Sequence, residues 1–173
     1  MGRISVRACR RHEYAILILP TAFTHVTFAV NPGVTVSPNL ASVVVHLNNG
    51  SQSKPLVNYL PGNSWVANQW QVVRIPLADL NSANANFNRV VIQSQVQTAG
   101  YGFSIDAVRL ESGSATPSAT LSVFADTMAP QWALSPWSGV AAIQSQWVMT
   151  GTGAIKADAN TWGGVDLDSR DAN

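Results

Sequence analysis

The chain has few of the residues that define disulfide-bonded, metal-binding or nucleic-acid-binding proteins. Its single cysteine, Cys9, excludes an intramolecular disulfide framework and a zinc site built from cysteines. Only 11% of the residues are charged, well below the usual fraction of about a quarter. The net charge of +1 hides a mildly acidic main part, because four of the 10 basic residues are Arg3, Arg7, Arg10 and Arg11. No clustered basic face for nucleic acid is visible, and no apolar run reaches the ~20 residues of a membrane span.

Patterns of catalytic residues are also missing. A glycosidase needs two carboxylates that face one sugar, and the spacing of Asp79, Asp106 and Glu111 does not predict a shared cleft. The three histidines have no ligand spacing, and the sequence contains neither a nucleophile elbow nor a glycine-rich phosphate loop. We therefore expect no enzymatic activity in this chain.

Most of the sequence alternates apolar and polar residues, as half-buried strands do. The clearest segments are 25–30, 42–47 and 71–77, and Asn-Pro-Gly or Asn-Gly turns follow the first two. A further short strand is expected at 56–60, and one helical turn within 78–87. Strands about ten to fifteen residues apart predict an all-β fold, namely an antiparallel β-sandwich of the jelly-roll kind.

The segment 101–111 contains a change of phase. Phe103 and Ile105 share one face, whereas an uninterrupted strand would turn Val108 and Leu110 to the other face. One extra residue near Asp106 keeps all four in the core, so the sequence predicts a β-bulge there.

Composition divides the chain into four parts. Residues 1–13 are basic and are expected to be disordered or signal-like, although 14–19 also has a strand pattern. Residues 14–112 form the expected sandwich module, and 113–119 (GSATPSA) is typical of a linker. Four of the six tryptophans follow this linker, in residues 120–173.

Two strand patterns, WQVVRIPLADL at 70–80 and YGFSIDAVRL at 101–110, resemble the closing half of carbohydrate-binding-module-like jelly rolls of the galactose-binding-like type. The resemblance covers about residues 23–111. The tail, with SVFADTMAPQWALSPWSG and MTGTGAIKADANTWGGVDL, resembles the opening half of such a module, although Ala125, Gly153 and Ala154 depart from the commonest pattern. The chain is then either a fragment across two tandem modules or one incomplete or circularly permuted sandwich. In a permuted sandwich the tail strands would pair with 23–30 and 103–110.

The same resemblance implies a structural calcium ion. In such modules an acid at the position of Asp106 joins a second acid near the first strand, which Asp126 matches here. Calcium takes hard oxygen ligands of this kind. The alternative is that Asp106 is satisfied by backbone N–H groups or by Arg109. The acids Asp166, Asp168 and Asp171 are expected in a solvated, disordered tail.

Sugar binding uses aromatic faces that stack on pyranose C–H surfaces, with polar groups that bind the hydroxyls. Tyr59 and Trp65 flank the turn at 61–62, which favours their exposure, whereas Trp70 begins a buried strand. Gln93 and Gln95 share one face of a strand, which suits a concave binding face and equally a plain solvated face. The carbohydrate-binding candidates are Tyr59, Trp65, Gln93, Gln95, Tyr101, Trp132 and Trp137, with His46 and Asn58 as further polar partners.

These observations predict a non-catalytic, secreted module that binds polysaccharide and is tethered to other domains of a longer parent protein. Two alternatives stay open. One is a structural or adhesion spacer without a sugar site, and the other is an accessory domain of a glycoside hydrolase whose catalytic residues lie outside this chain.

Overall fold

The computed structural model of the chain describes residues 17–48, 53–96, 101–113 and 120–169. The expected signal-like segment 1–13 and nearly all of the expected linker 113–119 lie outside these residues. The short helices are η1 (Pro20–Ala22), η2 (Pro38–Ser42), η3 (Leu56–Tyr59), η4 (Pro61–Asn63) and α1 (Leu77–Leu80). The strands are β1 (His25–Asn31), β2 (Val43–Leu47), β3 (Lys54–Pro55), β4 (Gln71–Pro76), β5 (Arg89–Ser94), β6 (Tyr101–Glu111), β7 (Thr120–Ala125), β8 (Thr127–Met128), β9 (Trp132–Gln144) and β10 (Ala154–Ser169). Among the described residues, no helix has both the length and the apolar character needed to cross a membrane.

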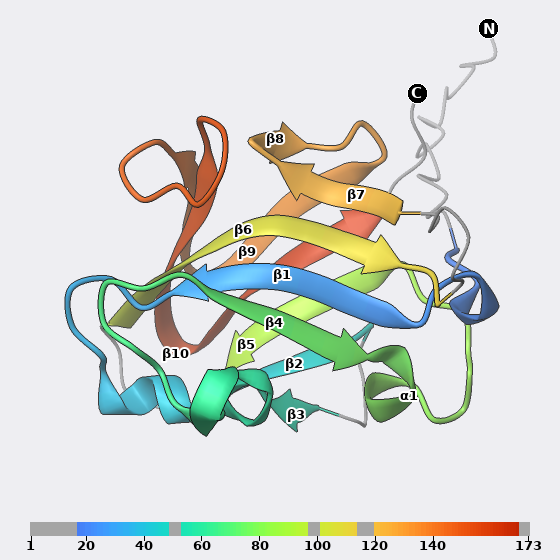
Figure 1. Cartoon of the computed structure of the whole chain (residues 1–173), viewed down its shortest axis with the longest axis horizontal. Coiled ribbons are helices and arrows are strands. Elements are labelled where there is room, and N and C mark those ends of the chain that lie inside the picture. The colour runs from blue at the N-terminus through green and yellow to red at the C-terminus, as the bar shows by residue number, and fades with distance from the viewer. Residues whose placement is uncertain (1–16, 49–52, 97–100, 114–119, 170–173) are drawn as a thin grey trace, which may run out of the picture.

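All strand pairs in the described residues are antiparallel, which confirms the predicted fold class. The strands form one sheet in the order β3-β2-β5-β10-β6-β1-β4, with β7, β8 and β9 beside this path. The sheet curls on itself, so that β4, β1 and β6 form a near layer while β2 and β5 pass behind them (Figure 1). A sandwich-like arrangement of two layers thus arises from a single curled sheet.

Strand β10 joins the two layers. Its first half pairs with β6, from Ile155 opposite Ile105 to Ala159 opposite Tyr101. Its second half pairs with β5, from Gly164 opposite Gln93 onward. The register against β9 is irregular between Ala159 and Gly164, at the place where β10 leaves one layer for the other. Strand β9 accompanies β10 through both halves.

The core lies between the layers and consists of the alternating apolar residues. Val26, Phe28 and Val30 of β1 are at most 1% exposed, as the two-residue period predicts. The expected strand at 56–60 is wrong, because this segment forms η3 instead. Leu56 and Leu60, the two buried residues, are four apart, which suits one helical turn as well as it suits a strand.

The predicted β-bulge in β6 is confirmed. Thr27 of β1 pairs with Arg109, and Ala29 pairs with Asp106, so two residues of β6 stand opposite Phe28 alone. Ala107 has a left-handed φ of 53°. Phe103, Ile105, Val108 and Leu110 are all at most 5% exposed. The extra residue therefore keeps both halves of β6 in the core, as the change of phase requires.

The strands that follow residue 119 belong to the same sheet as the strands before it. β7 pairs with the end of β6, and β10 lies between β5 and β6. The expected pairing of the tail with 103–110 is thus present, but pairing with 23–30 is absent, because β4 and β6 occupy both edges of β1. The two alternatives, one permuted module or the opening of a second module, both stay predictions.

Candidate functional site

The outer face of the layer formed by β2, β5, β9 and the second half of β10 carries a hollow of about 330 Å³. Strand pairing brings its residues together, since His46 pairs with Val91 and Val91 pairs with Asp166. Asp166 faces away from the core because its neighbours Val165 and Leu167 are buried. We name this feature the outer-face hollow; it is lined by His46, Asn48, Arg89, Val91, Gln93, Trp137 and Asp166.

Trp137 supplies the aromatic surface of the outer-face hollow. It stands opposite Gly164, and its indole Nε1 donates a hydrogen bond of 3.0 Å to the carbonyl oxygen of Trp162. The Cη2 and Cζ2 atoms of the indole occupy the space into which a side chain at residue 164 would project. The absence of a side chain at Gly164 therefore allows the half-buried indole to lie against β10 and line the hollow.

The backbone of Trp162 also positions Gln93. The Gln93 amide nitrogen donates to the same Trp162 carbonyl at 3.4 Å, and the Gln93 Oε1 atom lies 3.3 Å from Nε2 of His46. Trp162 has a left-handed φ of 56°, and its N–H donates to the carbonyl of Val96 at 3.1 Å. A non-glycine residue adopts this conformation only where its surroundings hold it. One strained backbone position thus fixes both the indole and the amide of the hollow.

Charged groups close the other side of the hollow. Arg89 forms ion pairs with Asp166 at 3.2 Å and with Asp168 at 2.6 Å. Burial raises the pKa of the Asp166 carboxyl to about 6, against the lowering effect of the Arg89 guanidinium, and the nearby Asp168 carboxylate adds to the rise. With one cation and two acids, this part of the hollow carries no excess positive charge at neutral pH.

Of the seven predicted sugar-binding residues, the structure brings Gln93 and Trp137 together in the hollow. Gln95 lies beyond the end of β5, is exposed, and its amide nitrogen donates to Ser53 Oγ at 3.5 Å. Tyr59 is half-buried, and its hydroxyl donates to Asp79 at 2.9 Å. Neither of these two side chains lines the hollow.

The other three predicted residues lie in the core. Trp65 is 9% exposed, packs 6.3 Å from the ring of Phe103 and donates to the carbonyl of Leu40. The expected exposure of Trp65 is therefore wrong, because its indole fills the space beneath η2. Tyr101 and Trp132 are 5% and 4% exposed. Both residues belong to the hydrophobic core, and neither lines the outer-face hollow.

The sequence did not indicate Arg89, Asn48 or Asp166 as lining residues of the hollow. The prediction of a disordered tail is wrong for Asp166 and Asp168, since both lie in β10 and pair with Arg89. Asp171 lies outside the described residues. The sequence did contain a sign of this strand. Val165 and Leu167 alternate with the two acids, which is the pattern of a half-buried strand.

The two predicted calcium ligands hold the same loop, the connection between β9 and β10. Asp106 is fully buried and accepts N–H bonds from Ala107, Met149 and Thr150 at 2.6, 2.8 and 3.2 Å. Asp126 accepts from Thr152 and Gly153 at 2.6 and 2.9 Å. Within the described residues no three histidine, cysteine or acidic side chains converge. These N–H partners match the alternative role foreseen for Asp106, and calcium binding stays a prediction.

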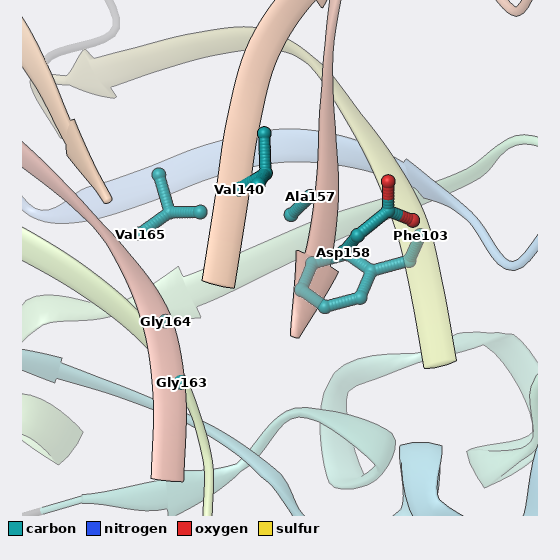
Figure 2. Close-up of a pocket in the computed structure, with 7 residues that line it drawn as sticks. All are labelled: Phe103, Val140, Ala157, Asp158, Gly163, Gly164 and Val165. Carbon is teal, nitrogen blue, oxygen red and sulfur yellow. The ribbon is translucent and has the colours of Figure 1, made fainter. Parts of the chain in front are cut away.

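A second, very small pocket lies where β10 changes layers. Figure 2 shows the Phe103 ring beside Ala157 and Asp158, with Val140 above and Val165, Gly164 and Gly163 along the neighbouring stretch of β10. Its volume is about 10 Å³, which is the space of one water molecule at most. This pocket is too small for an organic ligand.

No family model matches the chain, and comparison with curated proteins and with solved structures found no match. The resemblance to carbohydrate-binding modules therefore rests on the sequence patterns, and the structure supports only the all-β, sandwich-like fold that it implies.

Proposed function

We propose that the protein is a non-catalytic carbohydrate-binding module that holds a polysaccharide on its outer-face hollow. The observation that carries the proposal is the position of Trp137, whose indole is fixed by Gly164 and by the Trp162 carbonyl beside Gln93. An aromatic surface with adjacent polar groups is the combination that sugar rings need, because one face of a pyranose is apolar and its edge carries hydroxyls.

The polar residues around the indole suit hydroxyl groups. Gln93 offers an amide, His46 an imidazole, and Arg89 and Asp166 a charged donor and a charged acceptor. Strands supply most of the lining, and Asn48 directly follows β2. A site on a sheet face is open along its length, which suits an internal stretch of a polymer better than a single small molecule.

The proposed role also implies that the module is part of a longer protein. A module that only binds glycan is useful when it is tethered to a longer secreted protein, because tethering raises the effective concentration of the parent near the polymer. Secretion, the tether and structural calcium all belong to this proposal. The rival function is a structural or adhesion spacer, for which the buried Trp65 and Trp132 would simply be core residues.

Affinity electrophoresis tests the proposal. The protein, shown to be folded by circular dichroism, is run through native gels that contain hydroxyethylcellulose, xylan, galactomannan, mixed-linkage β-glucan or pectin. We expect retardation by at least one of the neutral polymers. Normal migration of the folded protein in every gel contradicts the proposal and favours the spacer.

A further inference from the structure

A second depression of similar size lies on the outer face of the other layer, over β1, β6 and the first half of β10. Its volume is about 310 Å³. Asn31, Ser104 and Lys156 stand side by side in one row across the three strands. Trp147, from the loop between β9 and β10, and Asp158 also line it, together with residues 101–103 of β6 and five residues of the segment 32–37. We name it the second hollow.

The loop that carries Trp147 is held at several points. Gln144 binds the backbone of Trp147 twice, with its Oε1 accepting from the N–H at 3.0 Å and its Nε2 donating to the carbonyl at 2.7 Å. Further along the loop, Asp106 accepts two N–H groups, and Asp126 accepts two more. A surface loop with so many side-chain bonds is pre-ordered, so binding through Trp147 would cost little conformational entropy.

Asp126 also explains Gly151, the first of the two glycines in this loop. Its carboxylate occupies the space into which a side chain at Gly151 would project, and Gly151 has a left-handed φ of 73°. The loop between β9 and β10 is the orange-red connection at the upper left of Figure 1. The two carboxylates thus hold the backbone of the loop that carries Trp147.

The charged groups of the second hollow are available to a ligand. Lys156 and Asp158 form an ion pair at 3.1 Å, and their side chains are 52% and 54% exposed. The Asp158 carboxylate lies over Gly102, which has no side chain to displace it. The pair is neutral as a whole and offers an exposed donor and an exposed acceptor in the hollow that Trp147 also lines.

We propose that the second hollow is a second glycan-binding site, with Trp147 as its aromatic platform and the Lys156–Asp158 pair as its hydroxyl-binding groups. The ligand class is an uncharged oligosaccharide or polysaccharide. The two hollows share no residue, so the chain binds two sugar segments at once. This inference shares the ligand chemistry of the proposed function but uses different residues, and each can fail without the other.

Indole N–H signals in a nuclear magnetic resonance titration test the proposal. Cellohexaose, xylohexaose and mannohexaose are the probes, and the Trp137 and Trp147 signals are assigned with the W137F and W147F variants. With at least one probe we expect both signals to move, with two oligosaccharides bound per chain. W137A should keep the movement of the Trp147 signal.

A milder variant protects the test against misfolding, since Trp147 is half-buried. K156M removes an exposed ammonium group. We expect it to weaken binding at the second hollow about three- to tenfold, which is the range of one ordinary hydrogen bond, while binding at the outer-face hollow is unchanged. Movement of the Trp147 signal alone supports the second site and contradicts the proposed function. Movement of the Trp137 signal alone overturns the second site, and no movement with any probe contradicts both.

Discussion

The indole of Trp137 lies where the side chain of residue 164 would begin, so glycine at 164 and the position of the indole depend on each other. The relationship joins two strands, β9 and β10, through a contact in which an added methyl group would meet the ring and also the backbone carbonyl oxygen of Ile92 in β5. Replacement of Gly164 therefore changes the binding surface, although Gly164 has no side chain of its own that could contact a ligand.

We therefore predict that G164A weakens polysaccharide binding several-fold. The added methyl group pushes the indole away from β10 and breaks its hydrogen bond to Trp162. Overpacking of this kind costs stability by about 1–3 kcal/mol, so binding is measured well below the melting temperature. In a W137A background the same change should have no further effect on binding; an equal loss in both backgrounds contradicts transmission through the indole.

Asp106 is predicted to be a major contributor to stability. D106A leaves the backbone N–H groups of Met149 and Thr150 without their acceptor, and the loss of two hydrogen bonds to a fully buried carboxylate should lower the free energy of unfolding by about 2–4 kcal/mol. Urea unfolding measures the change. D158N is the matched control, because Asp158 is half exposed, and it should stay within about 0.5 kcal/mol of the wild type. Equal effects of the two variants contradict the role assigned to Asp106.

Calcium binding is tested by thermal unfolding. If Asp106 and Asp126 share a structural ion, added calcium raises the melting temperature of the wild type, and a chelator reverses the rise. D126N should abolish this dependence, since it removes one of the two carboxylates that hold the loop between β9 and β10. A melting temperature that is the same with calcium and with chelator contradicts calcium binding and leaves the hydrogen bonds to the loop intact.

Asp166 makes the stability of the protein depend on pH. Its pKa in the folded protein, about 6, lies above the ordinary value of 3.8 because the carboxyl is buried. The folded state therefore holds this proton more tightly than the unfolded chain does, and the resulting stability is complete below about pH 4 and is lost as the pH rises through about 6. D166N cannot ionise, so it should gain on the order of 1 kcal/mol relative to wild type between these pH values. Melting curves at about pH 4, 5.5 and 7 measure the gain, and a constant difference contradicts it.

The left-handed residue of the bulge gives another prediction. Ala107 has a φ of 53°, a conformation that glycine adopts without strain. A107G should raise the free energy of unfolding by about 0.5–1 kcal/mol. A125G is the control at an exposed strand position, where glycine should lower stability by a similar amount. If both variants lose stability, the strain at Ala107 is not as described.

Local patterns in the sequence predicted local structure well. The change of phase around Asp106 predicted the bulge, because the alternation of Phe103 and Ile105 with Val108 and Leu110 leaves only one way to bury all four. The same reasoning failed at 56–60, where two leucines at the ends of five residues fit a helical turn equally well.

Long-range pairing accounts for what the sequence did not reveal. The outer-face hollow joins His46, Gln93, Trp137 and Asp166, and only the register of β10 against β5 and β9 brings them together. The sequence also did not reveal which aromatic residues are exposed. Trp65 and Trp137 both follow short polar stretches, yet one fills the core and the other lines the hollow.

The most direct measurement compares the affinity of W137A and W70A for a polysaccharide that retards the wild-type protein. Both tryptophans are half-buried, but only Trp137 lines the outer-face hollow. In a W147A background, in which the second hollow lacks its indole, loss of the stacking indole should lower affinity at least tenfold in W137A, which corresponds to about 1.4 kcal/mol, while W70A in the same background binds as W147A alone does. Undiminished binding by folded W137A in that background would contradict the glycan site on this face.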